Sequence, residues 1–356
     1  MQRVSSGTHM DYVYEMARTL REEEGLALTL LLEKGGSEAA PTWVKSQYFS
    51  LLPLRVLENF LFIMRERIHG TKIFYVHYSF ISAIFAGLIT AFFGGKVYYW
   101  NAGMPWQYKR PWYVEIYQSV AYRLIDVLVT GAESLRSGYM TTYSLKSEQI
   151  KIISNWIDLS HVQTDIDKKV LREKLRLPDE EPILLFVHKV VSRKGSQWLV
   201  PLMERLKNTR VHLVIAGDGS ETQSITVEAE SAGLLDRIHL LGRVERDSVI
   251  ALYQACSIFI MPSQEEGSPH SLIEALAYGL PSICFAVGGV SDTMPTEAHA
   301  YLYPYGNIEA MAQGVDTLLS NEVEYRKMQQ ASLIGVKKFA KPIAVQKFKA
   351  LLTEEF

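Results

Sequence analysis

The sequence has few cysteines and little net charge. Its 356 residues include only Cys256 and Cys284, both in apolar surroundings. They imply neither a disulfide framework nor a thiolate metal site, so we expect a cytoplasmic protein. A formal net charge of −2 gives no reason to expect nucleic acid as a partner. Short repeats and low-complexity segments are absent from the sequence, and residues 1–10 lack the apolar core of a signal peptide.

One long segment has no Asp, Glu, Lys or Arg. Residues 73–95 are long enough to span a bilayer. However, His77 interrupts the segment, aromatic residues and glycines are scattered through it, and residues 73–77 have the pattern of a strand. We therefore predict a strand, a buried helix and a second strand at 96–100 instead of a transmembrane helix.

Strand-like and helix-like segments alternate along the whole chain, which is 48% hydrophobic. This alternation predicts an α/β fold with parallel sheets. We expect two Rossmann-like, doubly wound domains facing a cleft, with ligands at the carboxyl ends of the strands. The first domain covers residues 1–158 and is joined by a C-terminal helix at 340–356. The second domain covers residues 159–339. The boundary between them falls inside a polar linker at 155–167. The predicted strands are 26–32, 73–77, 96–100, 127–130, 150–154, 183–188, 211–216, 238–241, 258–261 and 282–285.

Two glutamates in the C-terminal half frame a predicted helix start. Glu266 follows a strand, and Glu274 lies one turn inside the next helix. Between them, the amides of His270 and Ser271 are placed at the helix N-terminus, which suits an anion such as a diphosphate. The alternative is that Glu266 only favours the positive helix end and that Glu274 is a solvated surface residue.

A basic turn follows the predicted strand 183–188. It reads His188-Lys189-Val-Val-Ser-Arg-Lys194-Gly195, and two cations at such a turn can neutralise a diphosphate leaving group. An exposed basic turn without this function is the alternative. Gly217-Asp218-Gly219 also follows a strand, but a single Gly-x-Gly is weak evidence and is usually a tight turn.

Taken together, these segments resemble a known family. The matching text is HKVVSRKG, IAGDGS, LGRV, FIMPSQEEGSPHSLIEALAYGLPSI and VGG, in that order, between residues 183 and 294. It resembles the retaining GT-B glycosyltransferases of the glycosyltransferase family 4 (glycosyl transferases group 1) type. The N-terminal half agrees with this family only in pattern.

The resemblance implies roles for particular residues. Glu266 would contact the transferred sugar, and Lys194 and Lys189 would hold the donor diphosphate, although Lys189 stands where the family usually has arginine. Glu274 would accept bonds from the ribose, and Val244 would present its backbone to the base. Other implied residues are Gly217, Gly267, His270 and Ser271 at the donor and, more weakly, Gly7 and Asn101 on the acceptor side, where Asn101 replaces the family's usual histidine.

The function implied is transfer of a sugar from a nucleotide-diphosphate donor to an acceptor hydroxyl with retention, in glycan, polysaccharide or glycolipid synthesis. A nucleotide-sugar-binding module without transferase activity is the main alternative, and a GT-B-type epimerase has no specific residues in its favour. We expect no cofactor and no metal, a glycan or lipid-linked acceptor, and peripheral contact with the inner face of the membrane.

Three further features lead to expectations. We reject Asp165 and Asp167 as a metal site because no strand positions them.

An aromatic and basic cluster comprises Trp106, Tyr108, Lys109, Arg110, Trp112 and Tyr113. It could bind a sugar acceptor or contact a membrane interface. The alternative is that these residues pack within a loop and a helix start. Residues 1–10 lack the apolar strand that normally starts a Rossmann-like domain, so we expect the chain to be a fragment that has lost its first strand.

Overall fold

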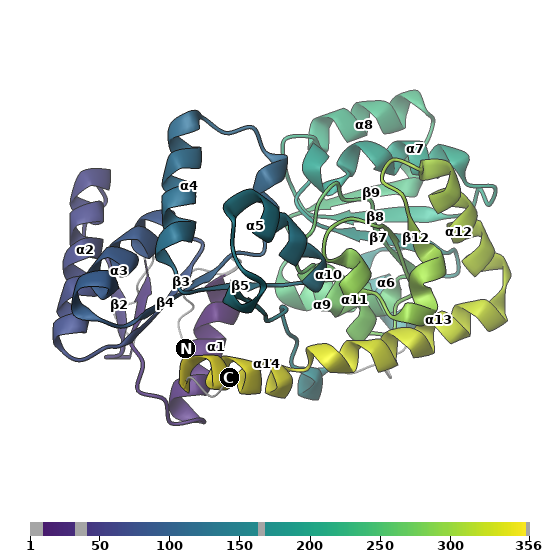
Figure 1. Cartoon of the computed structure of the whole chain (residues 1–356). Coiled ribbons are helices and arrows are strands. Elements are labelled where there is room, and N and C mark those ends of the chain that lie inside the picture. The colour runs from purple at the N-terminus through teal and green to yellow at the C-terminus, as the bar shows by residue number, and fades with distance from the viewer. Residues whose placement is uncertain (1–9, 33–40, 163–167, 354–356) are drawn as a thin grey trace. The chain divides into compact units, whose positions relative to one another are not determined.

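The computed structural model describes residues 10–32, 41–162 and 168–353 (Figure 1). The chain forms two compact units. Unit 1 consists of Met1–Thr130, Arg136–Ile153 and Ala344–Phe356, and unit 2 of Gly131–Leu135 and Ser154–Ile343. From the sequence we placed the domain boundary after residue 158 and assigned 340–356 to the first domain. The predicted loss of a first strand concerns residues 1–9, which lie outside the described residues.

Unit 1 is built on a parallel sheet with the strand order β3-β4-β5-β6. Helices cover it on both faces, with α4 above the strands and α1 and α14 below them in Figure 1. The ring of Phe348 on α14 packs edge-on against Tyr75 on β3, and Lys349 pairs with Glu24 just beyond α1. The strands are β3 (Ile73–His77), β4 (Lys96–Trp100), β5 (Val127–Thr130) and β6 (Ile150–Ile152), and the helices are α1 (Met10–Glu22), α2 (Leu52–Ile68), α3 (Phe80–Phe93), α4 (Trp112–Leu124), α5 (Arg136–Tyr143) and α14 (Lys341–Thr353).

A separate two-stranded parallel sheet belongs to the same unit. Strand β1 (Leu30–Leu32) pairs with β2 (Val44–Ser46). The predicted strand at 26–32 is therefore too long, because its residues find a partner strand only along Leu30–Leu32. The sequence did not reveal β2, which has only three residues.

The uncharged segment 73–95 forms the predicted strand and helix, followed by the second predicted strand. The expectation of a buried helix is wrong in part. Ala83, Ala86 and Ile89 on α3 are buried, whereas Leu88 and Phe92 are exposed. Helix α3 lies at the surface of unit 1, where the sheet and the neighbouring helices α2 and α4 cover part of it and its outer side is exposed. Among the described helices, none is both long and apolar enough to cross a bilayer.

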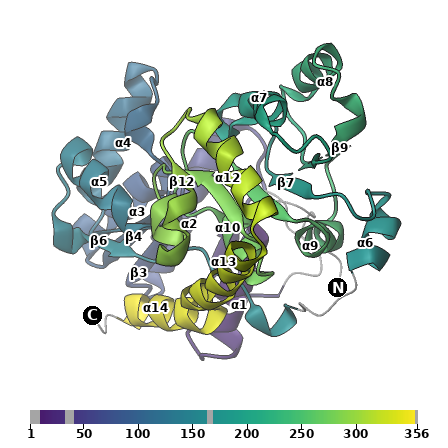
Figure 2. The same cartoon turned by 90° about the vertical axis from the view of Figure 1, so that its right-hand side faces the viewer.

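Unit 2 contains a six-stranded parallel sheet with the order β12-β11-β10-β7-β8-β9. Helices α7 and α8 lie above this sheet and α9 and α10 below it in Figure 1, and Figure 2 shows the unit from the side. The strands are β7 (Ile183–Val187), β8 (His212–Ala216), β9 (Ile238–Gly242), β10 (Ile258–Met261), β11 (Ser282–Phe285) and β12 (Leu302–Tyr303). The helices are α6 (Lys168–Leu175), α7 (Leu199–Arg205), α8 (Thr222–Ser231), α9 (Arg246–Ala255), α10 (His270–Ala277), α11 (Val290–Thr293), α12 (Ile308–Ser320) and α13 (Glu322–Gly335).

Strands β10 and β11 of unit 2 are buried over their whole length. All four residues of each strand are buried, because helices cover both faces of a parallel sheet. Cys256 and Cys284 are buried and free, as their apolar surroundings indicated. The two units are therefore parallel α/β structures, as predicted.

A close approach between two loops of unit 2 yields a stability prediction. Gly195 has φ +82°, and an added Cβ would lie 1.9 Å from the carbonyl oxygen of Pro262. Gly195→Ala should lower the free energy of unfolding by at least about 3 kcal/mol, because both the backbone conformation and the contact are unfavourable. Urea denaturation measures this loss.

Gly233→Ala is the matched control. Gly233 has φ +66°, but nothing lies within 4 Å of an added Cβ, so only the conformational cost of about 1 kcal/mol applies. Equal losses in the two variants would contradict the close approach of the two loops.

Candidate active site

Loops at the carboxyl edge of the unit 2 sheet carry five predicted site residues, namely Lys189, Lys194, Gly217, Glu266 and Gly267. These loops follow β7, β8, β10 and β11, and the ends of neighbouring parallel strands meet at one edge. Glycines allow these loops to touch. A Cβ on Gly217 would lie 1.8 Å from the His188 carbonyl oxygen, and one on Gly289 would lie 2.0 Å from the Gly267 carbonyl oxygen. The loops are thus held backbone against backbone.

The carboxylate of Glu266 is the centre of this group. Its Oε1 accepts hydrogen bonds from Lys194 Nζ at 2.8 Å, His188 Nε2 at 3.0 Å and Ser263 Oγ at 2.8 Å. The Glu266 side chain is only 6% exposed and that of Lys194 15%. The loops after β7 and β10 therefore meet on one carboxylate oxygen.

The charge states follow from these contacts. Burial alone would raise the pKa of Glu266, but the positive charge of Lys194 and the hydrogen bonds that Lys194 and His188 donate outweigh burial and hold this pKa well below its usual range. Burial lowers the pKa of His188, so its ring is neutral and its Nε2–H donates to the carboxylate, which can only accept. At neutral pH, Glu266 is an ionised group whose charge is balanced by Lys194.

The next residues along the chain form a second ion pair. Arg193 Nη1 lies 2.9 Å from Glu265 Oε1, and the Glu265 side chain is buried. Sequence reasoning assigned no role to Glu265, Arg193, His188 or Ser263. Arg193 and Glu265 stand directly beside Lys194 and Glu266, His188 opens the same basic turn, and Ser263 lies three residues before Glu266.

Glu274 lies in the first turns of α10, and its surface-residue alternative is wrong, because its side chain is only 13% exposed. Its Oε2 accepts a hydrogen bond from Tyr253 Oη at 3.1 Å, and its Oε1 lies 3.3 Å from Arg246 Nη1 and 3.4 Å from His270 Nδ1. Burial would raise the pKa of Glu274, but His270, Arg246 and Tyr253 lower it. The carboxylate is ionised and held in place.

The N-terminus of α10 itself is fixed by a polar contact. The backbone N–H of Asn155 donates to Ser268 Oγ at 2.8 Å, and Asn155 Nδ2 donates to the Ser268 carbonyl oxygen at 2.6 Å. The N–H groups of the first helical turn lack partners within the helix. Ser271 lies in this turn, and its buried hydroxyl has no hydrogen-bond partner among the described residues.

The other predicted residues lie in different settings. Lys189 is exposed, and its ammonium group has no ion pair with any residue that the structure describes. Val244 is half-buried against the core of unit 2. Asn101 belongs to unit 1, where its Nδ2 donates to Tyr122 Oη at 3.0 Å and its Oδ1 accepts from the Gly103 N–H at 2.8 Å. Gly7, Asp165 and Asp167 lie outside the described residues.

The aromatic and basic cluster of the sequence is divided in the structure. Trp106 packs edge-on against Tyr139 at 5.0 Å between ring centroids, and Arg110 donates to Gln118 at 2.7 Å. In contrast, Trp112 and Tyr113 are exposed. The packed alternative therefore holds for the first part of the cluster but not for the start of α4.

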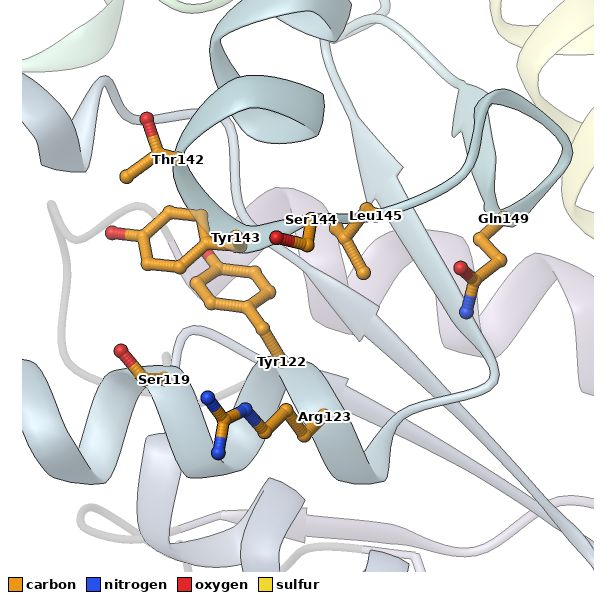
Figure 3. Close-up of a pocket in the computed structure, with 8 residues that line it drawn as sticks. All are labelled: Ser119, Tyr122, Arg123, Thr142, Tyr143, Ser144, Leu145 and Gln149. Atoms are coloured by element: carbon orange, nitrogen blue, oxygen red, sulfur yellow. The ribbon is translucent and has the colours of Figure 1, made fainter.

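Two pockets are lined by residues that are not among the predicted site residues. One, of about 300 Å³, lies between α4 and α5 in unit 1. Figure 3 shows its lining, which includes Ser119, Arg123 and Tyr143. The other, of about 610 Å³, lies in unit 2 beside Tyr253, Tyr278 and Tyr325. Within the part of the chain that the structure describes, no three His, Cys, Asp or Glu residues are grouped as metal ligands would be.

The pairing of Lys194 with Glu266 leads to a prediction about stability. Lys194→Met should lower the free energy of unfolding by about 3 kcal/mol, because it leaves a buried carboxylate without its cation. In the double variant Lys194→Met/Glu266→Gln no such charge remains. The loss should then be smaller than the sum of the two single losses by about 1–3 kcal/mol. Urea denaturation of the four proteins measures this coupling, and strict additivity would refute the pairing.

The chain matches a family model over part of its length. Residues 167–333 match the model described as Glycosyl transferases group 1. An uncharacterized glycosyltransferase of Methanocaldococcus jannaschii is 27% identical over 199 residues, which are 54% of this chain and 51% of that protein. The chain spans about half the length of the curated relatives it matches.

Solved structures resemble the whole chain. Sucrose-phosphate synthase of Thermosynechococcus elongatus gives a TM-score of 0.82 at 20% identity, over 98% of this chain and 94% of that one. HepE of Anabaena in complex with UDP-glucose gives 0.80 at 15% identity, over 100% and 97%. The chain therefore has the predicted GT-B fold of two Rossmann-like units, and residues 167–333 carry the sequence pattern of the glycosyl transferases of group 1, a class of sugar-transferring enzymes.

Proposed function

We propose that this chain is a glycosyltransferase that transfers a sugar from a nucleotide-diphosphate donor to an acceptor hydroxyl, with retention of configuration. The match of residues 167–333 to glycosyl transferases group 1 supports the activity. The observation that carries the proposal is the buried, ionised carboxylate of Glu266, held by Lys194, His188 and Ser263. It lies in the loop that leads into the N-terminus of α10.

The charges of these loops suit the two halves of the donor. As the diphosphate leaves, the sugar gains positive charge and the diphosphate gains negative charge. The carboxylate of Glu266 would stabilise the sugar, and Lys189, Lys194 and the amides of His270 and Ser271 would stabilise the diphosphate. Glu274 has lone pairs left for the ribose hydroxyls, because each carboxylate oxygen accepts more than one hydrogen bond.

Retention is proposed through attack on the same face from which the diphosphate leaves. A double displacement needs a carboxylate nucleophile and a second carboxyl group about 5 Å away. Glu266 Oε1 is already engaged by three donors, and the neighbouring Glu265 is paired with Arg193. In the proposed step the bond from the sugar carbon to the phosphate oxygen breaks, the bond to the acceptor oxygen forms, and the acceptor proton passes to the departing diphosphate.

The remaining parts of the proposal concern family, donor, acceptor and location. We assign the chain to family 4 with a donor of the nucleotide-sugar class, for which the UDP-glucose complex of HepE is a precedent. The acceptor is a glycan or a lipid-linked glycan on the cytoplasmic side. No metal takes part, because Lys189, Lys194 and the start of α10 already supply positive charge at the diphosphate.

A donor assay tests this function. The full chain is incubated with UDP-glucose, GDP-mannose or UDP-N-acetylglucosamine in EDTA, and release of the nucleoside diphosphate is measured. We expect release from one donor.

Lys189→Ala should lower the rate of release from that donor roughly 10- to 100-fold without loss of stability. Lys207→Ala is the control, because Lys207 is an exposed lysine of the same unit. Donor binding without release would favour the binding module, and activity only after adding magnesium or manganese would refute metal independence.

The two glutamates should differ in their kinetic effects. Glu266→Gln should lower kcat by about 100-fold or more, because it removes a charge that stabilises the transition state. Glu274→Gln should mainly raise KM, since its bonds to the ribose are the same in the ground state and the transition state. Steady-state kinetics separate the two, with thermal melting to confirm that both variants are folded. Small, equal effects on kcat would contradict the assigned roles.

A further inference from the structure

Helix α3 exposes an apolar face. It has no charged residue over its 14 positions, and its outward stripe consists of Ile81, Leu88 and Phe92, with exposed fractions of 41%, 43% and 83%. The opposite stripe, with Ala83 and Ala86, is buried. A surface helix normally places polar residues outward, so the outer face of α3 requires an explanation.

Helix α2 repeats this pattern. Its regular apolar stripe consists of Leu54, Leu57, Leu61, Met64 and Ile68. All of these except the half-buried Met64 are at least 40% exposed, whereas Asn59 on the other side is buried. Asn59 Nδ2 donates to Ser82 Oγ on α3 at 2.6 Å. The stripe that periodicity alone would assign to the core therefore faces solvent.

Helix α4 adds aromatic residues. Trp112, Tyr113, Ile116 and Tyr117 lie on its first two turns and are 51–73% exposed. Arg123 lies on the same side of the helix, seven positions beyond Ile116, and is exposed. The guanidinium group of Arg123 borders the pocket of Figure 3, together with the hydroxyls of Ser119 and Thr142.

The three helices are neighbours. Phe60 of α2 packs edge-on against Phe85 of α3, with 5.4 Å between ring centroids. On the other side of α3, Gly87 lies so close to Leu124 of α4 that an added Cβ would be 2.6 Å from the Leu124 Cβ. We call the outward sides of α2, α3 and α4 the apolar face of unit 1; the helices carry blue colours in Figure 1.

Charge is distributed unevenly in the same region. Residues 48–125 contain eight Lys and Arg but three Asp and Glu, a net of +5, in a chain whose formal net charge is −2. Arg65 on α2, Lys109 before α4 and Arg123 on α4 are exposed. The surroundings of the apolar face are therefore cationic, and the rest of the chain is acidic.

We propose that the apolar face of unit 1 docks on the surface of a bilayer that contains anionic lipids. Leu, Ile and Phe side chains would enter the boundary between headgroups and acyl chains, and Trp112, Tyr113 and Tyr117 would lie at headgroup level. The arginines and lysines would contact lipid phosphates, with Arg123 and the hydroxyls of its pocket forming one such contact. A second copy of the chain fits less well, because two surfaces of the same positive charge would face each other.

Vesicle sedimentation with the full chain tests this docking. The experiment needs no transferase activity, so a chain that does not bind vesicles would leave the proposed function untouched. The chain should bind vesicles of phosphatidylcholine with phosphatidylglycerol, and bind phosphatidylcholine alone much less. Leu57→Glu/Leu61→Glu should weaken binding by at least about tenfold, because it places charges in the apolar layer. Val323→Glu is the matched control, since Val323 is 79% exposed on α13 of unit 2.

A second variant separates charge from apolar contact. Arg65→Glu/Arg123→Glu should abolish the preference for phosphatidylglycerol, and added salt should weaken binding of the unmodified chain. Thermal melting confirms that each variant is folded. Equal binding by the unmodified chain and Leu57→Glu/Leu61→Glu would overturn the proposal. A dimer in light scattering that this variant dissociates would also overturn it, in favour of a second copy.

Discussion

The negative charge of Glu266 at the edge of the unit 2 sheet is the constraint on which the arrangement of the surrounding loops depends. A buried carboxylate is tolerated only where cations and hydrogen-bond donors compensate for the lost hydration. Lys194 and His188 come from the loop after β7 and Ser263 from the loop after β10, and all three donate to one oxygen. The carboxylate therefore connects two loops that are far apart in the sequence.

Glycines make this convergence sterically possible. Gly195, Gly217 and Gly289 each lie where a Cβ would be 2.0 Å or less from a carbonyl oxygen of another loop. Without side chains, the loops after β7, β8, β10 and β11 approach through their backbones, and polar side chains are left to fill the space at the strand ends. Gly217, a weak turn signal in the sequence, is thus a structural contact of the candidate site.

The two units present different surfaces. In unit 2, helices on both sides of the sheet leave strands β10 and β11 buried, and the polar chemistry is concentrated at the carboxyl edge. In unit 1, the helices α2, α3 and α4 pack against one another and expose apolar residues to solvent. A transferase acting on a lipid-linked acceptor would need both features, since the donor is a charged, water-soluble molecule and such an acceptor lies at a membrane.

Most of the strands and the donor segment could be predicted from the amino-acid sequence alone. Buried strands are continuous apolar runs, so the predicted bounds agree with the structure for 73–77, 96–100, 127–130, 258–261 and 282–285. The donor segment was recognised because residues 188–195 and residues 266–274 each form one short, continuous stretch of sequence. The tertiary structure was needed to show which side chains meet Glu266, because His188 reaches it from the loop after a different strand and Ser263 through the conformation of the loop after β10. It also decided that the stripe of Leu57 and Leu61 faces outward: periodicity shows that a helix has an apolar side, but the rest of the molecule determines whether that side is covered.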